Sequence, residues 1–388
     1  DSVGDVTLKA ASSLGIHHTQ LQLVQDGQVL PRGEDAAKFS GTEVQAVVVS
    51  LPRLCVSGDS DGAIHIWNQQ EMARSSSLRG HTDAVRAICV DSALRRAASA
   101  SHDTTLRLWD LDNLVCLGVL EGHTSAVIAL KADFTVQRAV SGGDDETVRV
   151  WDLQDLTCLG VLAGHTGMVV DLVADFSAGL AVSCSDDSSL RVWDLRTMAC
   201  TGHLQGHSEV TVASHADFTL RRAVSGSYDG CLRVWDLSDM TCLGRLDQGQ
   251  EDGWVLCLAA DFAAKRAVSG HRSGALRLWD LDKLISLGQT PGNGFSICAL
   301  RVDFPVLRAV TASWDGGISF WDLESMSCLK RVHAHADGVT TLDVAADARL
   351  AVSAGRDGIV LVWNLDTHGL LGRLEGQTAR AFDVKFCV

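Results

Sequence analysis

The sequence predicts an all-β protein in which eight similar units of four strands form a ring, preceded by a short segment of different pattern. Three observations lead to this prediction. A Trp-Asp or Trp-Asn pair recurs at a nearly constant interval, each interval contains four short apolar runs, and each carries the same polar residues at fixed distances from its Trp. A period of this length marks a repeat architecture, so it outweighs any local pattern.

The tryptophans define the repeat. Successive pairs lie 42 residues apart, except for one interval of 44 that ends at Trp279. The eight pairs begin at Trp67, Trp109, Trp151, Trp193, Trp235, Trp279, Trp321 and Trp363. Eight occurrences at one spacing form a specific signal, whereas a single Trp-Asp pair would carry no weight. The repeat region therefore covers residues 50–388.

Residues 84–121 show the pattern within one unit. The four runs are AVRAICV, RRAASAS, TLRLWD and LVCLGVL, and turn residues separate them. Short strands with turns at regular intervals are typical of all-β folds. A unit of this size cannot cover both of its own faces. Stacking the units around an axis covers those faces and leaves only short sheet edges.

Each unit also carries a polar set. Ser or Thr stands ten residues before the Trp in all eight units, Asp stands six before it in seven, and His stands 28 before it in five. Because buried polar groups need partners, we predict hydrogen bonds from indole to hydroxyl, hydroxyl to imidazole and imidazole to carboxylate. The predicted structural network comprises His81, Ser99, Asp103, Trp109, His123, Ser141, Asp145, Trp151, His165, Ser183, Asp187, Trp193, His207, Ser225, Asp229, Trp235, His335, Ser353, Asp357 and Trp363.

Together these motifs resemble WD40-repeat β-propellers over roughly residues 50–388. The resemblance implies an eight-bladed propeller that serves as an interaction scaffold and usually has no chemistry of its own. The segment 381–386, AFDVKF, falls where the first strand of a further blade would lie. We expect it to pair with the three strands of residues 53–79 and close the ring, with Gln377 in the position of the network His. Val44–Val49 also aligns without a gap and is the alternative source of that strand.

Residues 1–49 lie outside the repeat. Residues 2–14 are expected to form a capped helix that ends at Gly15, followed by a strand–turn–strand in LQLVQDGQVL and a strand in VQAVVV. This order resembles the ubiquitin-like β-grasp fold, an α+β fold, without its first hairpin. The resemblance runs through Ser2, Val3, Val6, Lys9, Gly15, Ile16, Leu23, Gly27 and Leu30. It implies that Val44–Val49 belongs to this segment, and the absence of a terminal Gly-Gly argues against conjugation to targets.

Composition excludes several classes of function. Lys+Arg 33 against Asp+Glu 48 gives a net charge of −15, which argues against nucleic acid and anionic lipid as partners. No apolar run approaches the 18 residues of a membrane span. Of the 12 cysteines, those at 116, 158, 200, 242 and 328 follow the repeat, and no Cys-x-x-Cys occurs. We therefore expect reduced thiols in the cytoplasm or another reducing compartment, and neither metal nor cofactor.

We find no nucleophile elbow, Walker loop or His-Glu-x-x-His motif, so we expect a protein without enzymatic activity. Large aromatic and basic residues outside the repeated positions gather in loops of units five to eight, which would open on one rim of the ring. Tyr, Trp and Arg dominate the energetics of protein interfaces. The predicted partner-binding residues are Tyr228, Trp254, His271, Arg272, Phe295, Trp314 and Arg356. Inward packing of Trp254 and Phe295 is the alternative.

The departures from the repeat fall in the same region. Units six and seven have Glu251 and Asn293 where the network His would stand, and unit six has two extra residues. The sequence thus favours a scaffold, or a subunit of a larger assembly, that binds a protein or peptide on the rim of blades five to eight. The alternative is a substrate receptor of a cullin-type ubiquitin ligase. Residues 193–196, Trp-Asp-Leu-Arg, resemble the Trp-Asp-x-Arg box of such receptors and end at Arg196.

Overall fold

The computed structural model describes residues 21–25, 28–29, 45–48, 54–68, 71–247, 252–377 and 379–387. Two compact units result: residues 1–53 with 92–94, and residues 54–91 with 95–388. The helix expected over residues 2–14 lies outside the described residues. Within the described part of the chain, no helix is long and apolar enough to cross a membrane.

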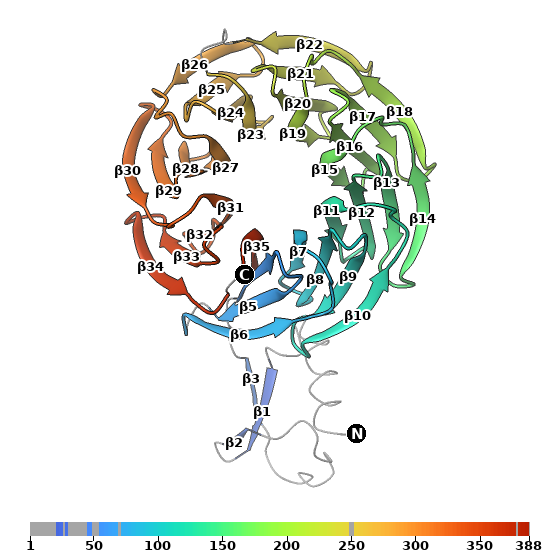
Figure 1. Cartoon of the computed structure of the whole chain (residues 1–388), viewed down its shortest axis with the longest axis vertical. Helices are drawn as coiled ribbons and strands as arrows, with labels where there is room; N and C mark the ends of the chain where they lie inside the picture. The colour runs from blue at the N-terminus through green and yellow to red at the C-terminus, as the bar shows by residue number, and fades with distance from the viewer. Residues whose placement is uncertain are drawn as a thin grey trace. The chain divides into compact units, whose positions relative to one another are not determined.

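The larger unit consists of eight antiparallel four-stranded sheets arranged in a ring (Figure 1), which confirms the predicted eight-bladed propeller. Blades are numbered here by their repeat Trp, from Trp67 in blade 1 to Trp363 in blade 8. The innermost strands of blades 2 to 8 and then of blade 1 are β7 (Val85–Asp91), β11 (Val127–Asp133), β15 (Val169–Asp175), β19 (Thr211–Asp217), β23 (Val255–Asp261), β27 (Ile297–Asp303), β31 (Val339–Ala345) and β35 (Ala381–Cys387). The second strands of blades 1 to 8 are β4 (Leu54–Asp59), β8 (Arg96–Ser101), β12 (Arg138–Gly143), β16 (Leu180–Ser185), β20 (Arg222–Ser227), β24 (Arg266–His271), β28 (Arg308–Ser313) and β32 (Leu350–Gly355).

The two outer strands complete each sheet. The third strands of blades 1 to 8 are β5 (Ile64–Asn68), β9 (Leu106–Asp110), β13 (Val148–Asp152), β17 (Leu190–Asp194), β21 (Leu232–Asp236), β25 (Leu276–Asp280), β29 (Gly317–Asp322) and β33 (Val360–Asn364). The outermost strands are β6 (Ala73–Leu78), β10 (Val115–Leu120), β14 (Thr157–Leu162), β18 (Ala199–Leu204), β22 (Thr241–Leu246), β26 (Ile285–Gln289), β30 (Ser327–His333) and β34 (Gly369–Leu374).

The hydrophobic core lies between neighbouring blades. Trp151 of blade 3, for example, packs in one cluster with Leu106 and Leu108 of blade 2. The second strands are almost fully buried, because a sheet face covers them on both sides, whereas the outermost strands are largely exposed. Each blade therefore supplies half of two cores, and the stacking of blades provides most of the apolar burial that stabilises the fold.

Glycines in the outermost strands allow the blades to approach. A Cβ atom at Gly160 would lie 2.8 Å from the sulfur of Met198, which comes from the next blade. The same contact recurs between Gly288 and Met326, where the distance would be 2.7 Å to Cγ. Met198 and Met326 have positive φ angles, 55° and 50°, because each occupies a tight turn. A side chain at either glycine would require the neighbouring methionine to move.

The two ends of the repeat meet in blade 1. β35 pairs antiparallel with β4, from Ala381 opposite Asp59 to Cys387 opposite Leu54, so the sheet order is β35-β4-β5-β6. β35 also contacts the inner strands on either side, β31 and β7. The carboxylate of Asp383 accepts a hydrogen bond from the Ile88 amide of blade 2 at 2.9 Å.

The smaller unit contains an antiparallel sheet of β1 (Leu21–Gln25), β2 (Gln28–Val29) and β3 (Gln45–Val48) in the order β2-β1-β3. The two strands predicted within LQLVQDGQVL are present as β1 and β2, with Gln25 opposite Gln28. β3 pairs with β1, whereas β35 pairs with β4.

Candidate interaction site on the rim

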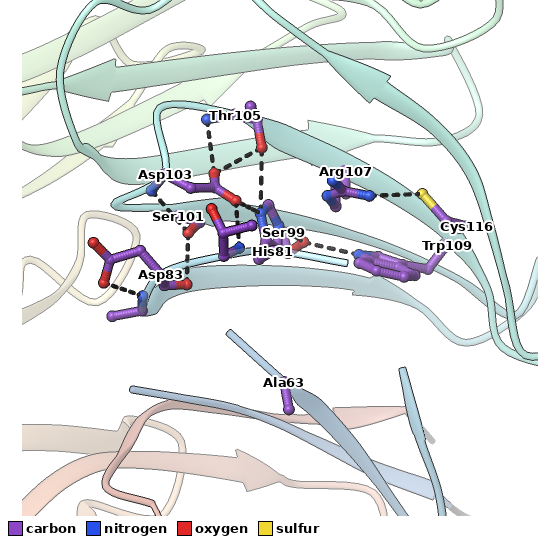
Figure 2. Close-up of polar contacts among 12 residues, drawn as sticks. Ala63, His81, Asp83, Ser99, Ser101, Asp103, Thr105, Arg107, Trp109 and Cys116 are labelled. Carbon is purple, nitrogen blue, oxygen red and sulfur yellow. Dashed lines mark hydrogen bonds and ion pairs between the residues drawn. The ribbon is translucent and has the colours of Figure 1, made fainter. Parts of the chain in front are cut away.

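A buried chain of hydrogen bonds fixes one end of each regular blade. Figure 2 shows it in blade 2, where the indole N–H of Trp109 donates to the hydroxyl of Ser99 at 2.8 Å. Nε2 of His81 lies 2.8 Å from that hydroxyl, and Nδ1 lies 2.8 Å from the carboxylate of Asp103. In the predicted arrangement the hydroxyl donates to Nε2 and the Nδ1–H donates to the carboxylate, which gives each of these polar groups a partner.

The same chain occurs in blades 3, 4, 5 and 8, as the sequence offsets predict. The hydrogen bonds join His123, His165, His207 and His335 to Ser141, Ser183, Ser225 and Ser353 at 2.7–2.9 Å. Burial alone would raise the pKa of Asp187, but hydrogen bonds from Ser189 and His165 lower it to about 2. Burial lowers the pKa of His165. At neutral pH the network of blade 4 thus contains a charged carboxylate and a neutral imidazole.

Three blades depart from this arrangement. In blade 1 the Ser57 hydroxyl donates to the side-chain oxygen of Gln377 at 2.9 Å, as predicted. In blade 6 the hydroxyl of Ser269 lies 2.8 Å from Nε2 of His271, whose side chain is fully buried. His271 therefore cannot contact a partner at the rim, contrary to the prediction, because it replaces the missing network His. In blade 7 no described imidazole contacts Thr311, which accepts from the indole of Trp321 at 2.9 Å.

Two sets of loops meet at this end of every blade. The residue before the turn Asp, or before Ser273 in blade 6, donates its amide to the carbonyl of the residue before the innermost strand. Tyr228 donates in this way to Val210 at 2.9 Å, and Arg272 donates to Trp254 at 2.9 Å. The amide of Trp314 bonds in the same way to Ser296 at 3.0 Å. The predicted residues of both loop types therefore lie on one rim of the ring.

Two adjacent blades bring three of the predicted residues together. The rings of Tyr228 and Trp254 stack, with centroids 4.4 Å apart and planes 13° from parallel. The guanidinium of Arg272 lies 4.2 Å from the centroid of the Trp254 ring. Trp254 is still 38% exposed, so the inward-packing alternative does not hold for it. A stacked pair capped by a cation forms a rigid surface that a partner can cover without ordering new side chains.

The remaining predicted residues continue around the rim but do not join that stack. Trp314 is 50% exposed, and the guanidinium of Arg356 lies 5.8 Å from its ring. Phe295 is also 50% exposed, which excludes inward packing for this side chain too. The candidate site is therefore a band of exposed rings on blades 5, 6 and 7, with Arg356 of blade 8 at one end.

Sequence reasoning missed Arg86, Arg380 and Phe382 on the adjoining rim. The guanidinium carbons of both arginines lie over the Phe382 ring, at 4.4 and 4.5 Å from its centroid. Comparison of equivalent positions in the repeat units could have found these residues in two ways. Arg380 occupies the position of Trp254, directly before an innermost strand, and Arg86 and Phe382 both stand second in such strands.

Other candidate features are not part of this rim. Among the described residues, no group of three His, Cys, Asp or Glu could hold a metal ion. The five periodic cysteines are free and exposed. A hollow of about 670 Å³ lies at the opposite end of the inner strands, where Asp133 and Asp175 line it and accept hydrogen bonds from the adjacent turns. Arg196 also lies at that end and donates to the Ser177 carbonyl at 2.8 Å.

Comparison with known proteins identifies the repeat. The family described as WD domain, G-beta repeat matches residues 73–110, 114–152, 156–194, 198–236 and 326–364, which together make up half of the chain. These matches end one residue after the tryptophans of blades 2, 3, 4, 5 and 8, the blades whose network contains the predicted His. A search of curated proteins gave no match. The crystal structure of the computationally designed Ika8 protein is similar over 81% of this chain and 94% of that one, with 28% identity and a TM-score of 0.71. The chain belongs to the WD40-repeat family.

Proposed function

We propose that the protein is a non-catalytic scaffold, or a subunit of a larger assembly, that binds a protein or peptide on the rim of blades five to eight. The observation that carries this proposal is the stack of half-buried Tyr228 on exposed Trp254 and Arg272, together with the half-exposed ring of Trp314. These residue types supply most of the binding energy in protein interfaces.

The construction of the rim also supports binding. The amides of Tyr228, Arg272 and Trp314 are held by hydrogen bonds to the neighbouring loop, and the buried Trp–Ser chain anchors the strands beneath. Side chains that are already ordered lose little conformational entropy on binding, so more of the contact energy contributes to affinity. A rigid rim of this kind can bind a partner without a change in the fold.

The test compares matched pairs of substitutions at equivalent turn positions. Tyr228→Ala with Trp314→Ala removes the two predicted anchors, whereas His102→Ala with Asp144→Ala alters the same turns in blades 2 and 3. Partners recovered with the wild-type protein, identified by mass spectrometry and purified, are measured against all three proteins. We expect the first pair to weaken binding by at least about tenfold, which corresponds to ~1.4 kcal/mol, and the second pair to have no effect. Unchanged affinity for every partner in the first pair would refute the site.

A ubiquitin-ligase receptor is the second candidate function, and the tetrapeptide that ends at Arg196 supports it. Its side chain is exposed, although one guanidinium nitrogen is bonded to the carbonyl of Ser177. This hypothesis requires that a cullin adaptor co-purifies with the protein and that Arg196→Ala abolishes the association. Retention of the adaptor by Arg196→Ala, or its absence from wild-type preparations, would reject this function.

Ring closure, the N-terminal segment and the cellular compartment are also part of the proposal. We infer that β35 closes the ring, an inference supported by its pairing with β4. We also infer that residues 1–49 form a ubiquitin-like segment, for which the order β2-β1-β3 gives partial support. Localisation in the cytoplasm or another reducing compartment is supported by twelve free cysteines, five of them exposed.

A further inference from the structure

Three arginines lie close together where the rim passes from blade 8 through blade 1 to blade 2. Arg356 occupies the turn of blade 8, and Arg380 precedes β35 in blade 1, where its carbonyl accepts a hydrogen bond from Ser60 at 2.9 Å. Arg86 is the second residue of β7 in blade 2. Arg86 and Arg380 share one aromatic platform, because both guanidiniums lie within 4.5 Å of the Phe382 ring centroid. We call Arg86, Arg356 and Arg380 the arginine cluster.

The carboxylates of Asp144 and Asp383 act electrostatically on Arg86, and that of Asp337 acts on Arg380, but none of them is close enough to form an ion pair with the arginine cluster. Among the ion pairs of the described residues, none involves Arg86, Arg356 or Arg380. The Nε atoms of Arg86 and Arg380 are buried and have no hydrogen-bond partner among the described residues. Burial, and then the charge of Arg380, lower the pKa of Arg86. Burial, and then the charge of Arg356, lower the pKa of Arg380.

This arrangement differs from that of the arginines at the opposite end of the strands. Arg222 lies 3.8 Å from the carboxylate of Asp236, and Arg308 lies 2.7 Å from that of Asp322. Like charges held together at a partly buried position repel each other more strongly than they would in water. An anion placed between them relieves this repulsion and can accept hydrogen bonds from the guanidinium groups.

We propose that the arginine cluster binds the carboxylates of a short acidic segment of the partner protein, beside the ring of Trp314. The inference rests on the proposed function and specifies the chemistry of the partner. The proximity of Arg356 to Trp314 makes the cluster continuous with the aromatic band, so one segment can contact both. The planar guanidinium suits a carboxylate, which it can bind through two parallel hydrogen bonds.

Charge elsewhere on the rim favours a short acidic segment over a nucleic acid. Asp144 and Asp186 occupy the equivalent turn positions of blades 3 and 4, and both side chains are exposed. Burial, and then the charge of Asp144, raise the pKa of Asp186, as expected for neighbouring carboxylates without a cation between them. A long polyanion would meet these carboxylates and the net charge of −15, whereas a short segment can remain on the basic sector.

The test measures direct binding by the full chain to three labelled probes: a hexaglutamate peptide ending in Phe, the same peptide with Gln in place of Glu, and a hexathymidylate. We expect the wild-type protein to bind the glutamate peptide, with an affinity that falls as salt is added. Arg86→Gln with Arg380→Gln should weaken this binding by at least about tenfold. The control pair Arg222→Gln with Arg308→Gln removes the same charge from the opposite end and should leave binding unchanged.

Equal affinity of the Arg86→Gln/Arg380→Gln variant and the wild type would overturn the proposal, as would equal affinity for the glutamine peptide. Tighter, arginine-dependent binding of hexathymidylate would overturn it in favour of a nucleic acid. The thermal midpoint shows whether each variant folds, and if the Gln pair does not, Arg86→Lys with Arg380→Lys keeps the charge and should lose part of the affinity. Glutamate binding that survives Tyr228→Ala with Trp314→Ala supports the cluster even if the aromatic rim fails its own test.

Discussion

Blades 2 to 5 and blades 6 and 7 have the same sheet topology but differ in what lies at the rim end of their strands. In blades 2 to 5 each network contains the predicted His, and the turn positions of blades 2, 3 and 4 carry His102, Asp144 and Asp186. In blades 6 and 7 the predicted His is missing, and the rim carries Trp254, Phe295 and Trp314 instead. Matches to the family model end in the third strands of blades 2 to 5, and none ends in blade 6 or 7.

This difference separates two roles that the repeat combines. The Trp–hydroxyl bond is kept in both groups, because a buried indole N–H needs an acceptor wherever the blades stack. The imidazole and carboxylate can be exchanged for other groups, as His271 in blade 6 shows. Blades 6 and 7 therefore keep the bond that packing requires, while their loops carry the residues assigned to partner binding.

The largest effect is expected from the hydroxyl in a regular blade. Ser183→Ala leaves the indole of Trp193 and the imidazole of His165 without their common partner, which costs roughly 2–5 kcal/mol for two buried groups. Thr311→Val in blade 7 leaves only the indole of Trp321 unsatisfied, so about 1–3 kcal/mol is lost. Urea unfolding at neutral pH measures both. Equal losses in the two variants would show that the imidazole adds nothing to the regular network.

The second effect depends on pH. Burial lowers the pKa of His271 to about 4, whereas the unfolded chain titrates near the ordinary value of about 6.5. The unfolded state therefore binds the extra proton first as pH falls, and stability drops between pH 6.5 and 4 by up to roughly 3 kcal/mol. His271→Gln should remove this part of the pH dependence, because Gln377 already fills the same role in blade 1. Parallel pH profiles for variant and wild type would contradict this account.

A smaller effect is expected at the stacked pair. Tyr228→Ala removes the ring that covers one face of Trp254, and exposed aromatic pairs contribute about 0.5–1.5 kcal/mol. Tyr228→Phe keeps the ring and should preserve stability. Chemical unfolding measures the loss, and tryptophan fluorescence should shift to longer wavelength only in the Ala variant. An identical spectrum for Tyr228→Ala and wild type would show that the rings do not stack in solution.

The repeated parts of the fold and the network could be predicted from the sequence, because one spacing fixes both strand order and hydrogen-bond partners. Trp109, Ser99 and His81 meet for that reason. The position of Gln377 followed from the same alignment. These partners belong to one repeat unit, so they can be predicted from the sequence without knowing how one blade is rotated relative to the next.

Features that depend on contacts between blades could not be predicted from the sequence. The stack of Tyr228 on Trp254 requires the rotation between blades 5 and 6. The role of His271 was misjudged, because it reaches Ser269 from two residues away rather than from the usual 18 before the hydroxyl. Asking which group satisfies the Ser269 hydroxyl would have identified it. Arg86 was hidden in an apolar run, and only the ring places it over Phe382.

The most direct measurement tests the junction of the two ends of the repeat. Phe386 lies opposite Cys55 in the pairing of β35 with β4, whereas Lys385 lies opposite Val56 and its side chain points to the other face. Under mild oxidation, Phe386→Cys should form a disulfide between Cys55 and the new thiol, detected by mass spectrometry of the digested protein. Lys385→Cys should form no such link. A link in neither variant, or equally in both, would contradict a ring closed by the C-terminal strand.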